Sequence, residues 1–141
     1  MELGERAYGP GSSREESDAI ANRVSVVDEH VLLLNEIPVQ SPYSVNLMFD
    51  KVEALSQNWK RFAYVVDLTA AKRPDAETRA VLKERSMHVS TRVAHVALVV
   101  GNNPIMRAMA RLFAYTMGFT SVGIHAARAE AIEEARRVVG R

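Results

Sequence analysis

The chain alternates between short apolar runs and longer segments in which apolar residues recur every three or four positions. Short apolar runs bounded by turn residues predict strands, and the wider spacing predicts amphipathic helices. The predicted strands are residues 21–27, 31–36, 62–68, 93–100 and 121–125, and the predicted helices begin near residues 42, 75, 104 and 128. The predicted order is therefore ββαβαβαβα.

Turn and cap residues support these boundaries. The polar residues 28–30 separate the first two strands and predict a hairpin. Ser41 and Asn103 each precede a proline. A polar residue followed by proline is typical of a helix start, with the polar residue as N-cap and the proline as the first helical residue. Gly118 is placed to end the third helix.

The third strand, residues 62–68, is apolar at successive positions except for Asp67, which indicates burial on both faces. Strands that alternate with helices pair in parallel through crossover connections, while the opening hairpin adds an antiparallel edge. We therefore expect an α/β fold with a five-stranded, mostly parallel mixed sheet and about four helices.

Residues 1–18 contain Gly9-Pro10-Gly11-Ser12-Ser13 among charged residues and show no periodicity. They predict a flexible N-terminal tail, followed by a single domain over residues 19–141. A chain of 141 residues has the length of one domain.

Composition excludes several classes of function. The chain has no cysteine, which excludes disulfides, thiolate metal sites and thiol nucleophiles. Its net charge is +1 and no basic stripe is interleaved with aromatic residues, so we expect no nucleic-acid partner. No apolar run approaches the length of a membrane span and the N-terminus does not resemble a secretory signal, so a cytoplasmic location is expected.

Three segments carry a resemblance to a known family. Tyr64-Val65-Val66-Asp67-Leu68-Thr69 ends the third strand, and Val96-Ala97-Leu98-Val99-Val100-Gly101 precedes a helix containing Met109-Ala110-Arg111-Leu112-Phe113. Together with the closing Ile124-His125 and Glu130-Ala131, this pattern resembles the SpoIIAA-like branch of the STAS fold. The resemblance covers residues 20–139 and implies a bacterial regulatory module.

In STAS proteins that act as anti-sigma-factor antagonists, an Asp-Ser pair at the start of a helix carries the phosphorylated serine. The corresponding positions here are Asp75 and Ala76, so the acidic residue is present and the hydroxyl is absent. Thr78 is an alternative phosphate acceptor, although a threonine in the first helical turn is more often a solvated or capping residue.

The resemblance implies a non-enzymatic regulatory or scaffold module that binds a protein partner, such as a regulatory kinase. We expect the contact surface to be the loop after the third strand and the start of the following helix, comprising Lys72, Arg73, Asp75, Thr78 and Arg79. A homodimer is also plausible, and no cofactor is expected.

The alternative is a domain that binds a small ligand such as a lipid, a nucleotide or an anion. The candidate residues are Thr69, Gly101, Asn102 and Asn103, at the loops where two neighbouring strands end. A helix N-terminus at this place offers backbone N–H groups to an anion. The competing interpretation is that Asn103 and Pro104 only cap the helix.

The remaining polar residues form no recognisable catalytic or metal site. Asp67 is expected to accept hydrogen bonds from loop N–H groups. The four histidines, His30, His88, His95 and His125, lack the spacing of metal ligands. We expect Met106, Met109 and Met117 to fill the core, and Arg107 and Arg111 to form an exposed pair.

Overall fold

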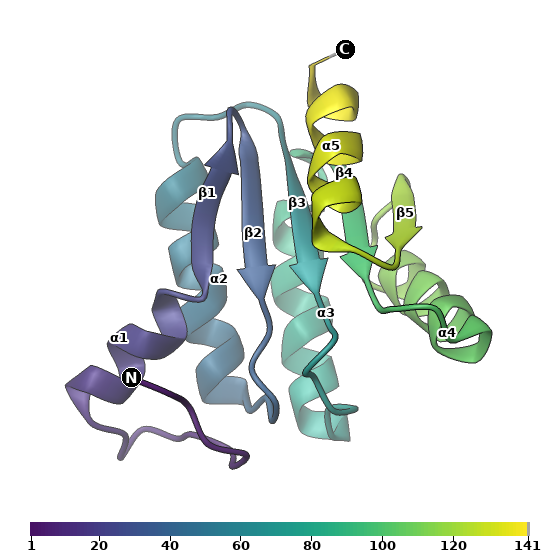
Figure 1. Cartoon of the computed structure of the whole chain (residues 1–141). Coiled ribbons are helices and arrows are strands. Elements are labelled where there is room, and N and C mark those ends of the chain that lie inside the picture. The colour runs from purple at the N-terminus through teal and green to yellow at the C-terminus, as the bar shows by residue number, and fades with distance from the viewer. Residues whose placement is uncertain (141) are drawn as a thin grey trace.

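The computed structural model describes residues 1–140, which contain a five-stranded sheet and five helices (Figure 1). The strands are β1 (Val24–Asp28), β2 (Val31–Asn35), β3 (Phe62–Asp67), β4 (Val93–Val99) and β5 (Val122–His125). The helices are α1 (Arg14–Ala21), α2 (Pro42–Ser56), α3 (Ala76–Ser90), α4 (Pro104–Thr116) and α5 (Arg128–Val139). All predicted elements are present, and α1 is an additional helix.

The strands lie in the order β1-β2-β3-β4-β5, which is also their order along the chain. β1 pairs with β2 in antiparallel fashion, and the other neighbouring strands are parallel. The mixed sheet with a hairpin at one edge is therefore confirmed. The hairpin turn contains His30, whose φ of 57° lies in the left-handed region that turns require.

Three of the four predicted helices begin with side-chain caps. Ser41 accepts a hydrogen bond from the Ser44 N–H at the start of α2, and Asn103 accepts from the N–H groups of Ile105 and Met106 at the start of α4. Both proline-containing starts are confirmed. Asp75 caps α3 by accepting from the Thr78 N–H.

The sheet is buried on both faces, as the continuous apolar character of β3 predicts. Figure 1 shows α2 and α3 covering one face and α5 crossing the other. Tyr64 and Val96 belong to the larger core on the α2 and α3 side. On the α5 side the core uses small residues, including Ala63 and Ala97 from the strands and Ala131 from the helix, because α5 lies close to the sheet.

The N-terminal segment contains a helix that the sequence pattern did not predict. Ser13 and Glu16 form a reciprocal capping box, which starts α1 at Arg14. Upstream, Tyr8 is only 3% exposed, its hydroxyl accepts a hydrogen bond from the Gly4 N–H, and its carbonyl accepts one from Ser41. Tyr8 and Ile20 therefore pack into the larger core, with Leu3 partly buried against it.

Helix α4 lies beside the edge strand β5 (Figure 1). Arg107 donates to the carbonyl of Ile124 at 3.1 Å, and Arg111 donates to that of Val122 at 3.5 Å. The two arginines therefore bind the outer edge of β5 instead of forming a free exposed pair. Among the described residues, no helix is long and apolar enough to cross a membrane.

The packing of the N-terminal segment can be tested with Tyr8→Ala. We expect this variant to lower the free energy of unfolding by about 3 kcal/mol, because it removes a buried aromatic side chain and its hydrogen bond to Gly4. Urea unfolding measures the effect. The matched control is Tyr115→Ala, whose side chain is 48% exposed on α4 and whose loss should change stability by less than about 0.5 kcal/mol. Equal effects of the two changes would contradict the packed arrangement.

Candidate functional site

A groove of about 730 Å³ lies between α3 and α4. β3 and β4 provide its floor, and most of its lining is apolar. The apolar lining includes Tyr64, Val66, Leu82, Leu98, Phe113 and Met117. A concave apolar space of this size is typical of a site for a small organic ligand.

Helix α4 leaves several large apolar side chains exposed. Ile105 is 72% exposed and Leu112 is 69% exposed, while Met106 and Met109 are each about half exposed. Of the three methionines expected in the core, only Met117 is buried. The expectation for Met106 and Met109 is wrong because α4 is held at the edge of the sheet, so that these side chains line the groove instead.

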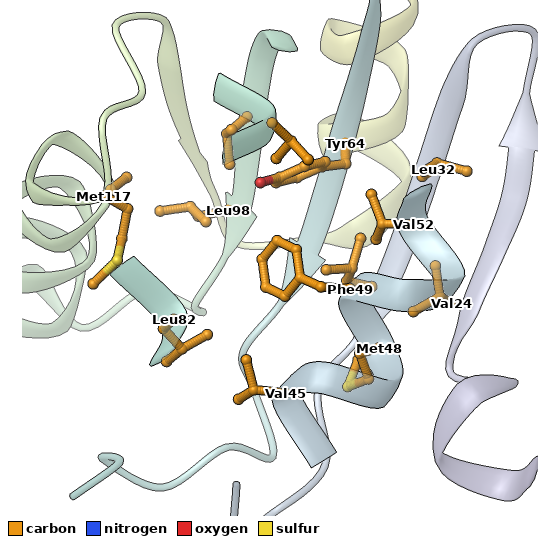
Figure 2. Close-up of a cluster of buried hydrophobic side chains, with 14 of the residues drawn as sticks. Val24, Leu32, Val45, Met48, Phe49, Val52, Tyr64, Leu82, Leu98 and Met117 are labelled. Carbon is orange, nitrogen blue, oxygen red and sulfur yellow. The ribbon is translucent and has the colours of Figure 1, made fainter. Parts of the chain in front are cut away.

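Three polar side chains interrupt the apolar lining near the β2 end of the groove. Glu36, Gln40 and Tyr64 are all nearly fully buried, and the amide of Gln40 donates to the carboxyl of Glu36. The Tyr64 hydroxyl has no hydrogen-bond partner within residues 1–140. Figure 2 shows this hydroxyl directed toward Leu98 and the side of the core on which Met117 lies.

Burial has a strong effect on Glu36. Removal of the carboxyl from water raises its pKa to about 7, although the hydrogen bond from Gln40 and the charge of Arg23 act in the opposite direction. Burial and the neighbouring Glu36 also raise the pKa of Tyr64, which therefore stays protonated. No pattern in the sequence indicates that Glu36 is buried, because a polar residue at the end of an apolar strand is ordinarily exposed.

Basic residues from the loop after β3 and from the first turns of α3 contribute to the lining of the groove. Lys72, Arg73 and Arg79 line it together with Thr69 and Pro74. Lys72 forms an ion pair with Glu5 at 3.2 Å, and Arg79 donates to the carbonyl of Pro74 at 2.8 Å. In the part of the chain that the structure describes, the exposed Arg73 side chain forms no ion pair or hydrogen bond. Lys72, Arg73 and Arg79 belong to the predicted partner surface, and all three line the groove.

Asp75 and Thr78 are engaged within the fold. Hydrogen bonds from Thr78 hold the pKa of Asp75 below its ordinary value. The Thr78 side chain is fully buried, so it does not contribute to an exposed surface. Ala76 is the first residue of α3, next to this cap.

The loop before α4 contributes less to the groove than expected. The N–H groups of Ile105 and Met106 are bound by Asn103 itself, at 2.9 and 3.2 Å, so the chain's own cap occupies two of the groups that an anion would use. Gly101 has a φ of +77°, which a turn of this shape requires. Thr69 lines the groove, whereas Gly101, Asn102 and Asn103 lie outside its lining.

Asp67 at the end of β3 has a structural role. Its carboxylate accepts hydrogen bonds from the N–H and hydroxyl of Thr69 and from the guanidinium of Arg128. Partial burial acts to raise the pKa of Asp67, but these hydrogen bonds outweigh it and the pKa lies below its ordinary value. The contact with the loop was predicted, while the contribution of Arg128 was not.

Two of the histidines share one carboxylate beneath α5. Glu134 contacts the Nε2 atoms of both His95 and His125, and the Nδ1 atom of His95 lies 2.7 Å from the Ser121 hydroxyl. Gly123 lies directly under this carboxylate, where a Cβ atom would collide with Glu134. Within residues 1–140, no group of three potential ligands is arranged to hold a metal ion.

Comparisons with known proteins identify the fold. No family model and no curated protein matches the sequence. Among solved structures, the chain is similar to an uncharacterized protein of the DUF3478 family from Shewanella loihica PV-4, which has a SpoIIAA-like fold. The TM-score is 0.67 at 10% sequence identity, and the match covers 79% of this chain and 90% of the other. The chain therefore has a SpoIIAA-like α/β fold, in agreement with the resemblance seen in its sequence.

The buried carboxyl of Glu36 makes the stability of the protein depend on pH. The carboxyl titrates near 4.5 in the unfolded chain and at about 7 in the fold. Between these values the folded protein holds a proton that the unfolded chain has lost, so stability falls as the pH rises through this window. We expect Glu36→Gln to raise the free energy of unfolding by up to about 3 kcal/mol near pH 8 and to have little effect near pH 4.5.

Urea unfolding of both proteins at the two pH values tests this expectation. Glu84→Gln is a suitable control, since it removes an exposed carboxylate of α3. If Glu36→Gln changes stability equally at both pH values, the carboxyl is not protonated by burial.

Proposed function

We propose that this protein is a non-enzymatic binding module that holds an apolar small molecule in the groove between α3 and α4. The observation that carries the proposal is the groove itself, with its volume of about 730 Å³ and its largely apolar lining. This is the range of volumes found for small-molecule sites. The loop after β3 then serves as the opening of the ligand site.

The exposed side chains of α4 support this proposal. Met106 and Met109 are flexible and half exposed, and both line the groove. Methionine adapts to apolar surfaces of different shape, and such residues are frequent at sites that bind apolar ligands. Burial of these side chains by a ligand would supply favourable free energy in proportion to the apolar area removed from water.

A catalytic function has less support. A hydrolytic or transfer site requires a nucleophile, a base and a group that stabilises developing charge, all facing one accessible space. The groove lining includes Thr69 and Thr116, but their hydroxyls donate to Asp67 and to the Leu112 carbonyl, and no histidine of residues 1–140 lines the groove. The Ser121 and His95 pair lies on the other face of the sheet, beneath α5, and His95 is 4% exposed.

Ala110→Trp tests the ligand site by filling the groove from α4. We expect the wild-type protein to bind the uncharged fluorescent probe N-phenyl-1-naphthylamine and the variant to bind it at least about tenfold more weakly, because the indole occupies the same space. Fluorescence titration measures both affinities. Thr116→Trp, at an exposed position of the same lining, provides a second blocking variant if the first one unfolds.

The matched control for these variants is Ala108→Trp, which places the same side chain on α4 outside the groove lining. It should bind the probe as the wild type does. A wild-type protein that fails to bind the probe, or blocking variants that bind it unchanged, would show that the groove is not a ligand site.

A second candidate function is regulation through a protein partner that contacts the loop after β3. The observation that favours it is the exposed Arg73, which forms no ion pair or hydrogen bond among residues 1–140, beside the exposed Lys72 and Asp75. A charged side chain left free at a loop between rigid elements is suited to partner recognition. With Ala76 in place of a serine, such recognition would not be switched by phosphate at that position.

Arg73→Glu tests the partner surface. We expect the change to abolish co-purification of a partner from the native host while the thermal midpoint stays the same, because Arg73 is exposed and makes no contact that stabilises the fold. Lys60→Glu reverses an exposed charge elsewhere and should leave the co-purification intact. A partner retained by Arg73→Glu would exclude this surface.

A further inference from the structure

Exposed apolar side chains are concentrated on one helix. Within residues 1–140, eight large apolar side chains are exposed, and five of them lie on the 13-residue helix α4. Single exposed apolar residues are common on protein surfaces, whereas a contiguous patch on the order of a few hundred Å² marks a contact site. Met87 of α3 adds to this patch, because it is also exposed and lies next to Gly118, just after α4.

The exposed residues of α4 include a series with the spacing of paired helices. Ile105, Met109, Leu112 and Thr116 are separated by four, three and four residues, and all four are exposed. This alternation is that of the a and d positions of paired helices, where each side chain inserts between side chains of the facing helix. We call these four residues the seam. Met109 and Leu112 also line the groove, whereas Ile105 does not, so the seam borders the groove.

The seam carries no charge. The charged residues of α4 are Arg107 and Arg111, and both donate to carbonyls on the outer edge of β5. A helix that lies on a membrane surface places cations beside its apolar face, and a partner selected by charge needs a charged side chain to recognise. A second copy of the seam needs neither, because two identical uncharged surfaces meet without burying an unpaired charge.

We propose that this chain forms a symmetric dimer through the seam of α4. In a twofold contact the same residues are used on both sides. Two antiparallel copies of α4 then place Met109 opposite the partner's Leu112, and Ile105 opposite the partner's Thr116. One helix face buries less than the roughly 800 Å² per partner of a stable complex, so we expect a reversible dimer with a dissociation constant of about 1–100 μM.

Sedimentation equilibrium of the full chain, from about 1 μM to 1 mM, tests the dimer. Ile105→Glu places a carboxylate in the seam and should weaken association at least about tenfold, because the charge is buried without a partner. Ile105 is 72% exposed in the single chain, so the thermal midpoint of the variant should not fall. Val26→Glu adds the same charge at an exposed apolar residue of β1 and should leave association unchanged.

Crosslinking locates the contact independently. The chain has no cysteine, so one introduced thiol reports one position. Leu112→Cys lies near the proposed twofold axis and should give a covalent dimer with a short bismaleimide crosslinker. Glu84→Cys, at an exposed position of α3, should stay monomeric under the same conditions.

A wild-type protein that remains monomeric throughout this concentration range would overturn the inference. A dimer that Ile105→Glu leaves intact would also overturn it, because such a dimer uses another face. Binding of a monomeric wild type to phosphatidylglycerol vesicles that is lost in Ile105→Glu would assign the patch to a membrane surface instead. These outcomes leave the proposed function untouched, since Ile105 lies outside the groove lining and the variant should still bind N-phenyl-1-naphthylamine.

Discussion

The attachment of α4 to the open edge of β5 determines the shape of the groove. The carbonyls of Ser121, just before β5, and of His125 accept hydrogen bonds from the N–H groups of Val96 and Val100. Those of Val122 and Ile124 face away from the sheet. Arg107 and Arg111, one helical turn apart on α4, donate to these outer carbonyls. The edge is thereby protected from pairing with another strand. The same contact holds α4 beside the sheet, so the space between α3 and α4 stays open.

The buried polar cluster imposes a cost on the fold that packing does not explain. Glu36 and Tyr64 lie on the same face of the sheet as the larger core, where apolar side chains of similar volume would pack without loss of hydrogen bonds. Natural proteins place such groups in their interiors mainly where a function needs them. Glu36, Gln40 and Tyr64 also belong to the groove lining, so this cost falls at the place where the proposed function puts the ligand.

Much of the fold could be predicted from the sequence, because its signals are local. The caps at Ser41 and Asn103 and the apolar run of β3 each depend on neighbouring residues. The pair Ser13 and Glu16 carried an equally local signal for α1, which the glycine and serine residues around it obscured. The position of α4 could not be predicted. The spacing of apolar residues along a helix shows that one face is apolar, but it does not show which other helix or strand packs against that face. The burial of Glu36 depends likewise on contacts between distant segments.

The loop between β3 and α3 connects the two candidate functions. Its backbone is held at Lys72, whose N–H donates to the Pro38 carbonyl, and at Asp75, which caps α3. Ala71 and Pro74 line the groove, while the side chains of Arg73 and Asp75 are exposed at its edge. A ligand in the groove and a protein partner would therefore bind the same short segment. Binding of one would affect the other only if the two favour different positions of this loop, because coupling between sites requires a difference in affinity for two conformations.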